Sequence, residues 1–310
     1  MKVDGGIGTD LHRAGAQAAE LEAAGYSGAW TAETSHDPFF PLLLAAEHTE
    51  QMELGTSIAV AFARNPMTLA NIGWDLQAFS KGRFILGLGS QIKPHITKRF
   101  SMEWSHPAPR MREMIMAIRA IWDTWENGTP LAFRGDFYTH TLMTPFFTPD
   151  RADLAGFGVP KIFLAGVGEL MTEVAGEVCD GFLCHGFTTE KYLREVTIPA
   201  LTRGLPGGQV DGRLRDRRAR LRRHRHQRGA DGGGRRRHPP ADRLLRLDAR
   251  RPVLELHGWG GLQDELNTLS KQGKWVEMGN LIDDGPEHVR RPWSASRTDR
   301  TRVAPSLRRH

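Results

Sequence analysis

Cysteine is scarce in this chain, where only Cys179 and Cys184 occur among 310 residues. Both lie in one apolar stretch, so they suit the buried thiols of a reduced protein better than a disulfide framework. Their spacing is not C-x-x-C, and the chain has no second pair. A zinc site built on paired cysteines is therefore not expected.

Long apolar runs are missing as well. No run of about eighteen apolar residues occurs, which argues against a membrane-spanning helix. Residues 1–5 lack the apolar core of a secretory signal. We therefore expect a cytoplasmic protein with no membrane partner.

The most biased stretch is residues 206–251, which lack Lys, Phe, Ile, Asn, Tyr, Ser, Thr and Glu. Sixteen of these 46 residues are Arg. The nine residue types present have codons built mainly from G and C. The stretch also has no apolar period that would predict a core-facing helix or strand. The tail, residues 285–310, repeats the bias with seven Arg and no Lys.

Two interpretations compete for this arginine-rich stretch. A run of like charges cannot bury enough apolar surface to fold, which is typical of a disordered basic arm that binds nucleic acid. Natural basic arms usually mix Lys with Arg and carry Ser or Thr, and residues 206–251 have none of these three types. We therefore favour the hypothesis that residues 206–251 and 285–310 are frame-shifted segments of an otherwise normal enzyme.

The net charge of +6 comes from these two segments. Residues 206–251 carry sixteen Arg against five acidic residues, and the tail carries seven against two, which leaves −10 for the rest of the chain. The part expected to fold is acidic, so a nucleic-acid partner is disfavoured.

Residues 1–205 alternate short strand signals with helical periods. Strands are predicted at residues 1–7, 27–33, 54–62, 83–89, 160–166 and 181–186. Helices are predicted at residues 11–24, 38–46, 67–79, 109–125, 170–179 and 190–201, with an inserted β-hairpin at 132–149.

Six β/α units predict a parallel sheet, because strands that alternate with helices pair in parallel. The first turn, Gly5-Gly6-Ile7-Gly8-Thr9, is not G-x-G-x-x-G, so a TIM (β/α)8 barrel is favoured over a doubly wound sheet. Strands seven and eight would fall in the two arginine-rich segments and are expected to be lost or altered. The expected divisions are residues 1–205, 206–251, 252–284 as a helical barrel segment, and 285–310.

Three segments in this order resemble the luciferase-like monooxygenase superfamily, in its branch that depends on coenzyme F420. They are residues 55–70 with Arg64-Asn65-Pro66, residues 80–90 with Ser80-Lys81-Gly82-Arg83, and residues 165–182. The resemblance covers residues 1–205 and 252–284. It implies a barrel that binds a flavin or deazaflavin at the carboxyl ends of its strands and transfers a hydride to or from it.

The resemblance implies a polar cluster beside the cofactor ring and substrate at Glu33-Thr34-Ser35-His36-Asp37. His36 is the best candidate for handling a proton, since imidazole is the side chain that ionises near neutral pH. Ser35 is a candidate for cofactor binding. Ser35 or Asp37 also has the place of a helix N-cap before Pro38, and both readings stay open.

Further cofactor contacts are implied at three other strand ends. Ser57 and Ile58 match a site where the family often has a non-prolyl cis peptide against the central ring. Ser90 and Gln91 are expected at the pyrimidine edge of the ring. Gly166, Val167 and Gly168 open a helix whose free N–H groups suit a phosphate, although a plain glycine turn is an equal alternative.

The chain departs from sugar-phosphate dehydrogenases of this branch at two positions. Ile92 stands where they have an acidic proton donor, and Thr188 where they have a phosphate-binding lysine, which argues against glucose-6-phosphate as substrate.

The segment of residues 93–106 is a candidate lid. Lys98 and Arg99 suit an anionic cofactor tail, and Trp104 and His106 suit the wall of a substrate pocket. A zinc site from His95 and His106 lacks a third ligand, and no metal is expected.

The sequence thus indicates an oxidoreductase that transfers a hydride between coenzyme F420 and a small organic substrate. An FMN-dependent luciferase-like monooxygenase is the alternative within enzymes. An arginine-rich nucleic-acid-binding protein, or an inactive frame-shifted product, is the alternative outside them. A homodimer stays open.

Overall fold

The computed structural model describes residues 2–186, 188–205, 222–223, 251–274 and 277. The chain divides into two compact units, Met1–Asp231 and Gly232–His310. Most of the arginine-rich stretch and all of the tail lie outside the described residues, and so does the expected eighth strand.

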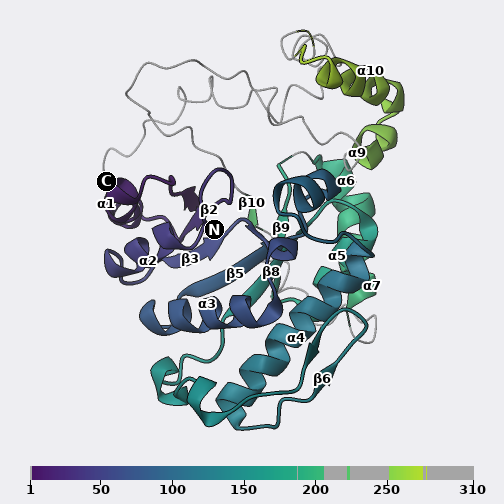
Figure 1. The fold of residues 1–310 in the computed structure, drawn as a ribbon. Helices are drawn as coiled ribbons and strands as arrows, with labels where there is room; N and C mark the ends of the chain where they lie inside the picture. Colours follow the sequence, from purple (N-terminus) through teal and green to yellow (C-terminus); the bar gives the residue numbers. More distant parts are fainter. Residues whose placement is uncertain (1, 187, 206–221, 224–250, 275–276, 278–310) are drawn as a thin grey trace, which may run out of the picture. The chain divides into compact units, whose positions relative to one another are not determined.

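The first unit is built on a curled parallel sheet (Figure 1). Every neighbouring pair of strands along the sheet is parallel. In spatial order the strands are β1 (Asp4–Gly6), β2 (Gly28–Thr31), β3 (Glu53–Thr56), β5 (Phe84–Gly89), β8 (Lys161–Gly166), β9 (Gly181–Cys184) and β10 (Arg222–Arg223); β4 (Ala59–Val60) pairs with β5. The fold is the predicted TIM-barrel class, seen as a curled parallel sheet over the described residues.

Helices cover the outer face of the sheet, and Figure 1 shows α3, α4 and α5 along that face. Their ends follow local signals: Asn65 caps α3, where its side chain accepts from Thr68 N at 2.9 Å, and Gly128 ends α4 with a φ of 71°. The helices of this unit are α1 (Leu11–Ala23), α2 (Phe40–Glu47), α3 (Pro66–Phe79), α4 (Pro107–Asn127), α5 (Glu169–Val178), α6 (Glu190–Tyr192) and α7 (Ile198–Gly204).

The inner face of the sheet is filled by large side chains placed over glycines. Trp30, Ile85, Phe163 and Leu183 form one buried cluster, and the rings of Trp30 and Phe163 lie 6.1 Å apart. A Cβ added to Gly55 would lie 2.5 Å from the Trp30 ring, and one added to the glycine that opens β9 would lie 2.5 Å from Phe163. The inner layer therefore interlocks large residues with glycine, as barrel interiors require.

Three predicted elements differ from the structure. The strand predicted at residues 54–62 is split into β3 and β4, and the cis Ser57–Ile58 peptide lies between them. The helix predicted at 190–201 is interrupted by a π-helical turn at Leu193–Thr197. The hairpin is reduced to β6 (Phe133–Arg134) and β7 (Thr139–His140), and the Glu113 carboxylate accepts hydrogen bonds from the N–H groups of the turn between them.

The arginine-rich stretch contributes one strand, which its side-chain pattern did not predict. β10 pairs in parallel with β9, with Arg222 opposite Leu183 and Arg223 opposite Cys184. Pairing in a sheet uses backbone groups, so it does not require an apolar period. The seventh strand was expected to be lost or altered in this stretch, and a two-residue strand is found there.

The second unit contains α9 (Arg251–Leu256) and α10 (Gly260–Lys271), two helices within or beside the segment predicted to be helical at residues 252–284, of which residues 275–276 and 278–284 lie outside the described residues. Its described buried residues are Val253, Leu254, Gln263 and Leu266. Among the residues that the structure describes, no helix is long and apolar enough to cross a membrane.

Glu22 joins α1 to the start of β3. Its carboxylate accepts hydrogen bonds from the backbone N–H groups of Glu50, Gln51 and Met52, at 2.7 to 3.2 Å. Burial raises the pKa of Glu22. The three N–H groups and the charge of Arg83 together lower it by more than burial raises it, so the pKa lies below its ordinary value of 4.5.

A lowered folded-state pKa stabilises the protein above the unfolded value, and this contribution is lost as the pH falls through the folded value. We expect Glu22→Gln to flatten the loss of stability between about pH 5 and pH 3. Urea unfolding across this range checks it, with Glu20→Gln on the exposed face of α1 as the control. Equal pH dependence in wild type and Glu22→Gln would contradict the expectation.

Candidate active site

The carboxyl ends of parallel strands share one edge of a sheet, so the structure brings the predicted site segments to the same edge. The β2–α2 loop follows Thr31, the cis peptide follows Thr56, and Ser90 follows Gly89. Gly166 ends β8 in the same direction. This carboxyl edge is the candidate active site.

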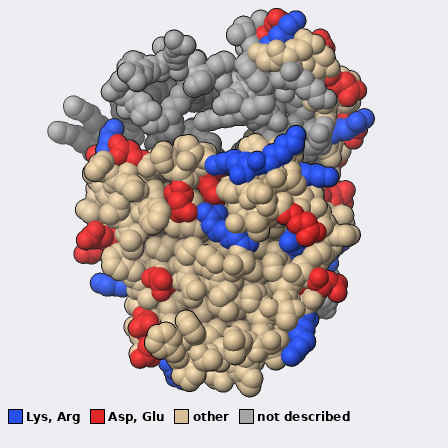
Figure 2. All heavy atoms as spheres, viewed as in Figure 1, with Lys and Arg blue, Asp and Glu red and all other residues tan. Residues whose placement is uncertain are grey.

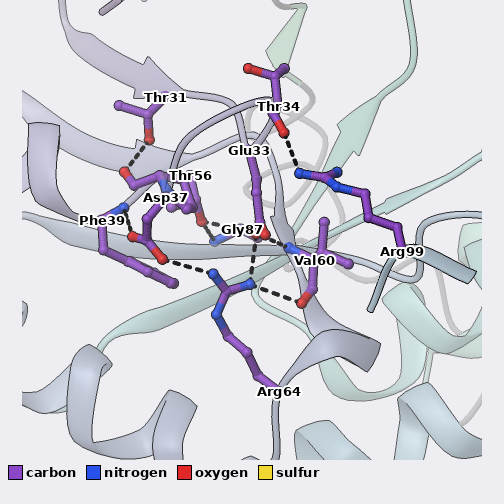
Figure 3. A network of polar contacts seen from close by, with 11 residues as sticks. Thr31, Glu33, Thr34, Asp37, Phe39, Thr56, Val60, Arg64, Gly87 and Arg99 are labelled. Carbon is purple, nitrogen blue, oxygen red and sulfur yellow. Dashed lines mark hydrogen bonds and ion pairs between the residues drawn. The ribbon is translucent and has the colours of Figure 1, made fainter. Parts of the chain in front are cut away.

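One arginine organises the β2–α2 loop (Figure 3). Arg64 Nη1 donates to Glu33 Oε2 at 2.6 Å, and Arg64 Nη2 donates to Asp37 Oδ2 at 2.9 Å. Glu33 Oε2 also accepts from Val60 N at 2.7 Å, and Arg64 Nη1 donates to Val60 O at 3.1 Å. The side chains of Glu33 and Arg64 are only 6% and 14% exposed, so this ion pair is largely removed from water.

Backbone contacts fix both ends of the same loop. Glu33 N donates to Ile58 O at 3.1 Å, and Asp37 Oδ1 accepts from Phe39 N at 2.8 Å. The α2 helix begins at Phe40 after Phe39, without a side-chain cap. The predicted N-cap role of Ser35 or Asp37 is therefore wrong, because Asp37 caps the turn before the helix.

The tip of the loop points outward from this network. Thr34, Ser35 and His36 are exposed, whereas the residues on either side are partly buried. The structure thus presents His36 at the carboxyl edge, and its catalytic role stays a prediction.

The cis peptide lies beside two buried clusters. Ile58 is partly buried and packs against the cluster of Trp30 and also against the larger core cluster that includes Phe62 and Leu88. A Cβ added to Gly89 would lie 2.8 Å from Ile58 Cγ1, so β5 approaches Ile58 as closely as glycine allows. The cis peptide that the resemblance implied at Ser57–Ile58 is present.

Ser90 and Gln91 turn the chain out of β5. Ser90 Oγ donates to Gln91 O at 3.1 Å, and Gln91 Oε1 accepts from Ile92 N at 3.1 Å. Gln91 has a φ of 63°, in the left-handed region that non-glycine residues seldom adopt. Both side chains therefore shape this turn, and their contact with a cofactor stays a prediction.

The turn after β8 opens directly onto α5. Gly168 is the N-cap residue and supplies no side chain to the helix N–H groups. Tyr192 Oη donates to Val167 O at 3.2 Å, which fixes the middle of the turn. Burial, and then the charge of Glu169, raise the pKa of Tyr192, so this phenol stays protonated. Thr188 Oγ1 is buried and has no hydrogen-bond partner among the described residues.

The segment of residues 93–106 is anchored to the edge at two points. Arg99 Nη2 donates to Thr34 O at 2.6 Å. The Trp104 ring lies edge-on to Phe62 at 5.7 Å, directly after β4. Lys98 and Arg99 are both exposed, and Arg99 is held by the β2–α2 loop.

His106 lies apart from these anchors. It is exposed, has a φ of 38°, and its ring lies 5.9 Å from Phe137 of the hairpin. The structure therefore joins Trp104 to the end of β4 and His106 to the hairpin. In the described part of the chain, no group of three or more His, Cys, Asp or Glu residues has the arrangement of a metal site.

The network of Glu33, Arg64 and Asp37 was missed by the sequence reasoning. A signal was present: Arg64 is the one charged residue between Glu53 and Asp75. A charged side chain in an apolar surrounding requires partners of opposite charge. Glu33 and Asp37, on either side of His36, are such partners.

Comparison with known proteins agrees with this geometry. The family model of luciferase-like monooxygenase matches residues 2–289, which include the arginine-rich stretch. An uncharacterised protein of Mycobacterium tuberculosis is 54% identical over 289 residues, covering 92% of this chain and 83% of that protein. The F420-dependent glucose-6-phosphate dehydrogenase of Mycolicibacterium smegmatis is 27% identical over 195 residues, covering 61% of this chain and 55% of that enzyme.

Solved structures show the same fold at low identity. The coenzyme F420-dependent tetrahydromethanopterin reductase of Methanopyrus kandleri superposes with a TM-score of 0.60 at 16% identity, covering 92% of this chain and 84% of that one. The monooxygenase RslO1 of Streptomyces bottropensis superposes with a TM-score of 0.52 at 18% identity, covering 84% and 90%. The chain belongs to the luciferase-like monooxygenase family, and its distant homologues include F420-dependent oxidoreductases.

Proposed function

We propose that this chain transfers a hydride between coenzyme F420 and a small organic substrate at the carboxyl edge of its sheet. The observation that carries the proposal is the F420 dependence of a homologue that matches 61% of the chain. Three features of the edge support the proposal. They are the exposed imidazole of His36, the close approach of Gly89 to Ile58 at the end of β5, and the N-terminus of α5, which has no side-chain cap.

Three glycines near this edge leave open space beside the backbone, which supports the proposal. A Cβ added to Gly168 or Gly186 would meet no heavy atom of the described residues within 4 Å, and one added to Gly6 would meet a single carbonyl oxygen at 3.9 Å. Side chains at these positions would fill the space. The N–H groups at the start of α5 add a favourable site for negative charge.

The proposal assigns each part of the edge a role. Ser57–Ile58 and Ser90–Gln91 hold the ring, Ser35 lies against it, and the Gly166–Gly168 turn takes the phosphate. When bound, the deazaflavin supplies a carbon that accepts or donates a hydride. His36 gives or takes the accompanying proton, while Trp104 and His106 border the substrate and Lys98 attracts the anionic tail.

A fluorescence titration of the purified 310-residue chain with F420 and with FMN tests the assignment. We expect saturable binding of F420 and little binding of FMN. Saturable binding of FMN alone, with rapid reaction of the reduced flavin with oxygen, would replace the proposal by the monooxygenase that the family description favours. Binding of neither cofactor to soluble protein would contradict both.

A nucleic-acid-binding function has less support. The chain outside residues 206–251 and 285–310 has a net charge of −10, and among the described residues on the face shown in Figure 2, Lys and Arg side chains are interspersed with Asp and Glu on a largely uncharged surface. A nucleic-acid site needs a continuous basic area. We expect no binding to duplex DNA that falls steeply with salt.

We also propose that residues 206–251 and 285–310 are translated out of frame. The support is their composition, since sixteen Arg and no Lys occur in the first segment. Translation of the coding DNA in three frames tests this: an alternative frame should yield mixed-composition sequence with a strand pattern. If none does, the arginine-rich segments are native and the hypothesis fails.

We also expect a homodimer and a cytoplasmic location. A homodimer is checked by analytical ultracentrifugation of the purified chain. A cytoplasmic location is checked by cell fractionation.

A further inference from the structure

We propose that Arg64 is a positioning residue that fixes His36 at the carboxyl edge through Glu33 and Asp37. The inference rests on the proposed function, because it takes His36 as the group that handles the proton. Arg64 lies after β4, on a different segment from His36, so its effect passes through the loop.

The two carboxylates that Arg64 binds stand on either side of the loop tip. Glu33 precedes Thr34, Ser35 and His36, and Asp37 follows them. One guanidinium therefore holds both ends of a three-residue tip, with N–O distances of 2.6 and 2.9 Å. The planar fork of arginine donates in two fixed directions, which the ammonium of lysine cannot reproduce.

Each carboxylate also accepts a hydrogen bond from a backbone N–H group. Glu33 Oε2 accepts from Val60 N, and Asp37 Oδ1 accepts from Phe39 N. Arg64 also donates to Val60 O, and its guanidinium lies 5.4 Å from the centre of the Phe39 ring. The loop is thereby tied to β4 and to the start of α2 at once (Figure 3).

The same contacts relate the loop to the cis peptide. Glu33 N donates to Ile58 O at 3.1 Å, and Ser57 N donates to Thr31 O at 2.6 Å. The position of His36 relative to Ser57–Ile58 is therefore set by the network that Arg64 closes. A displacement of about 1 Å between reacting groups is enough to lower a rate about a hundredfold.

Arg119 of α4 provides a matched control, because its carboxylate partner lies at the start of β9. Its Nη2 donates to Asp180 Oδ2 at 2.8 Å, and this carboxylate accepts from Ile162 N, so it is also an arginine–carboxylate–backbone link. Asp180 lies at the amino end of β9, away from the carboxyl edge. Arg119→Lys removes a comparable contact without touching the candidate site.

The first experiment measures amide hydrogen exchange in the cofactor-free protein. Arg64→Lys, which keeps the charge, should raise exchange at Val60 and Phe39 about tenfold or more, and Arg119→Lys should leave both amides unchanged. Arg64→Met should give the same result if it folds. Unchanged exchange in Arg64→Lys would overturn the inference, whether or not F420 binds.

The second experiment separates positioning from general damage. In Arg64→Lys we expect kcat with F420 to fall about ten- to a hundredfold, while the Kd for F420 changes less than about threefold. In a His36→Gln background the same change should lower kcat no further, because Arg64 acts through His36. Additive losses would overturn the inference. Failure of the wild type to bind F420 would overturn the proposed function and leave the exchange result to decide the role of Arg64.

Discussion

Replacing His36 by Gln should lower kcat for F420-coupled turnover by about 10²- to 10⁴-fold, which is the usual contribution of a positioned proton-transfer group. Gln keeps the size and polarity of the side chain but cannot take up or release a proton near neutral pH. His36 is exposed on a loop whose ends are held by Arg64, so the substitution should leave the fold intact. The Kd for F420 should change little.

Steady-state kinetics with a panel of small alcohols and carbonyl compounds measures this effect on the substrate that wild type turns over fastest. His140→Gln is the control, because this histidine lies in β7 of the hairpin and outside the parallel sheet. If His36→Gln retains more than about half of wild-type kcat, His36 does not transfer the proton and another group at the carboxyl edge must do so.

Replacing Gly87 by Ala should cost more than about 3 kcal/mol of folding free energy and leave little folded protein. A Cβ at this position would lie 1.7 Å from Thr56 O, a backbone atom of the neighbouring strand. Relief would require β3 and β5 to separate, since no rotamer change can move a carbonyl oxygen. Thr56 Oγ1 also donates to Gly87 O and accepts from Gly87 N, and both bonds would be lost.

Urea unfolding followed by tryptophan fluorescence measures the loss, since Trp30 and Trp74 are almost fully buried in the first unit. Gly186→Ala is the control, because its Cβ would meet no heavy atom of the described residues within 4 Å. An unfolding midpoint of Gly87→Ala equal to that of wild type would show that the close approach of β3 and β5 is absent in solution.

Most elements of the first unit were predictable because their signals are local. The helix predicted at residues 67–79 is found at Pro66–Phe79, and the strand predicted at 83–89 is found at Phe84–Gly89. In both, an apolar period and a turn residue lie within the element itself. The order of strands and helices then restricts the fold to a parallel sheet.

The errors occur where a distant partner decides the local conformation. The N–H groups of the hairpin turn donate to the Glu113 carboxylate, which lies more than twenty residues earlier in the chain. The position of β10 within the arginine-rich stretch was not predicted, because its side chains do not indicate the backbone pairing with β9. Side-chain periodicity carries no information about such partners.

By itself, the sequence determined the β/α order, the luciferase-like segments and the strand ends at which His36, Ser57, Ile58 and Ser90 would be found. Only the tertiary structure decided that Arg64 joins Glu33 and Asp37 around His36, because these residues lie 31 and 27 positions from Arg64 in the chain. Ion pairs of this kind depend on where strands bring their ends together. That geometry arises from the packing of the whole sheet and from no single segment of the chain.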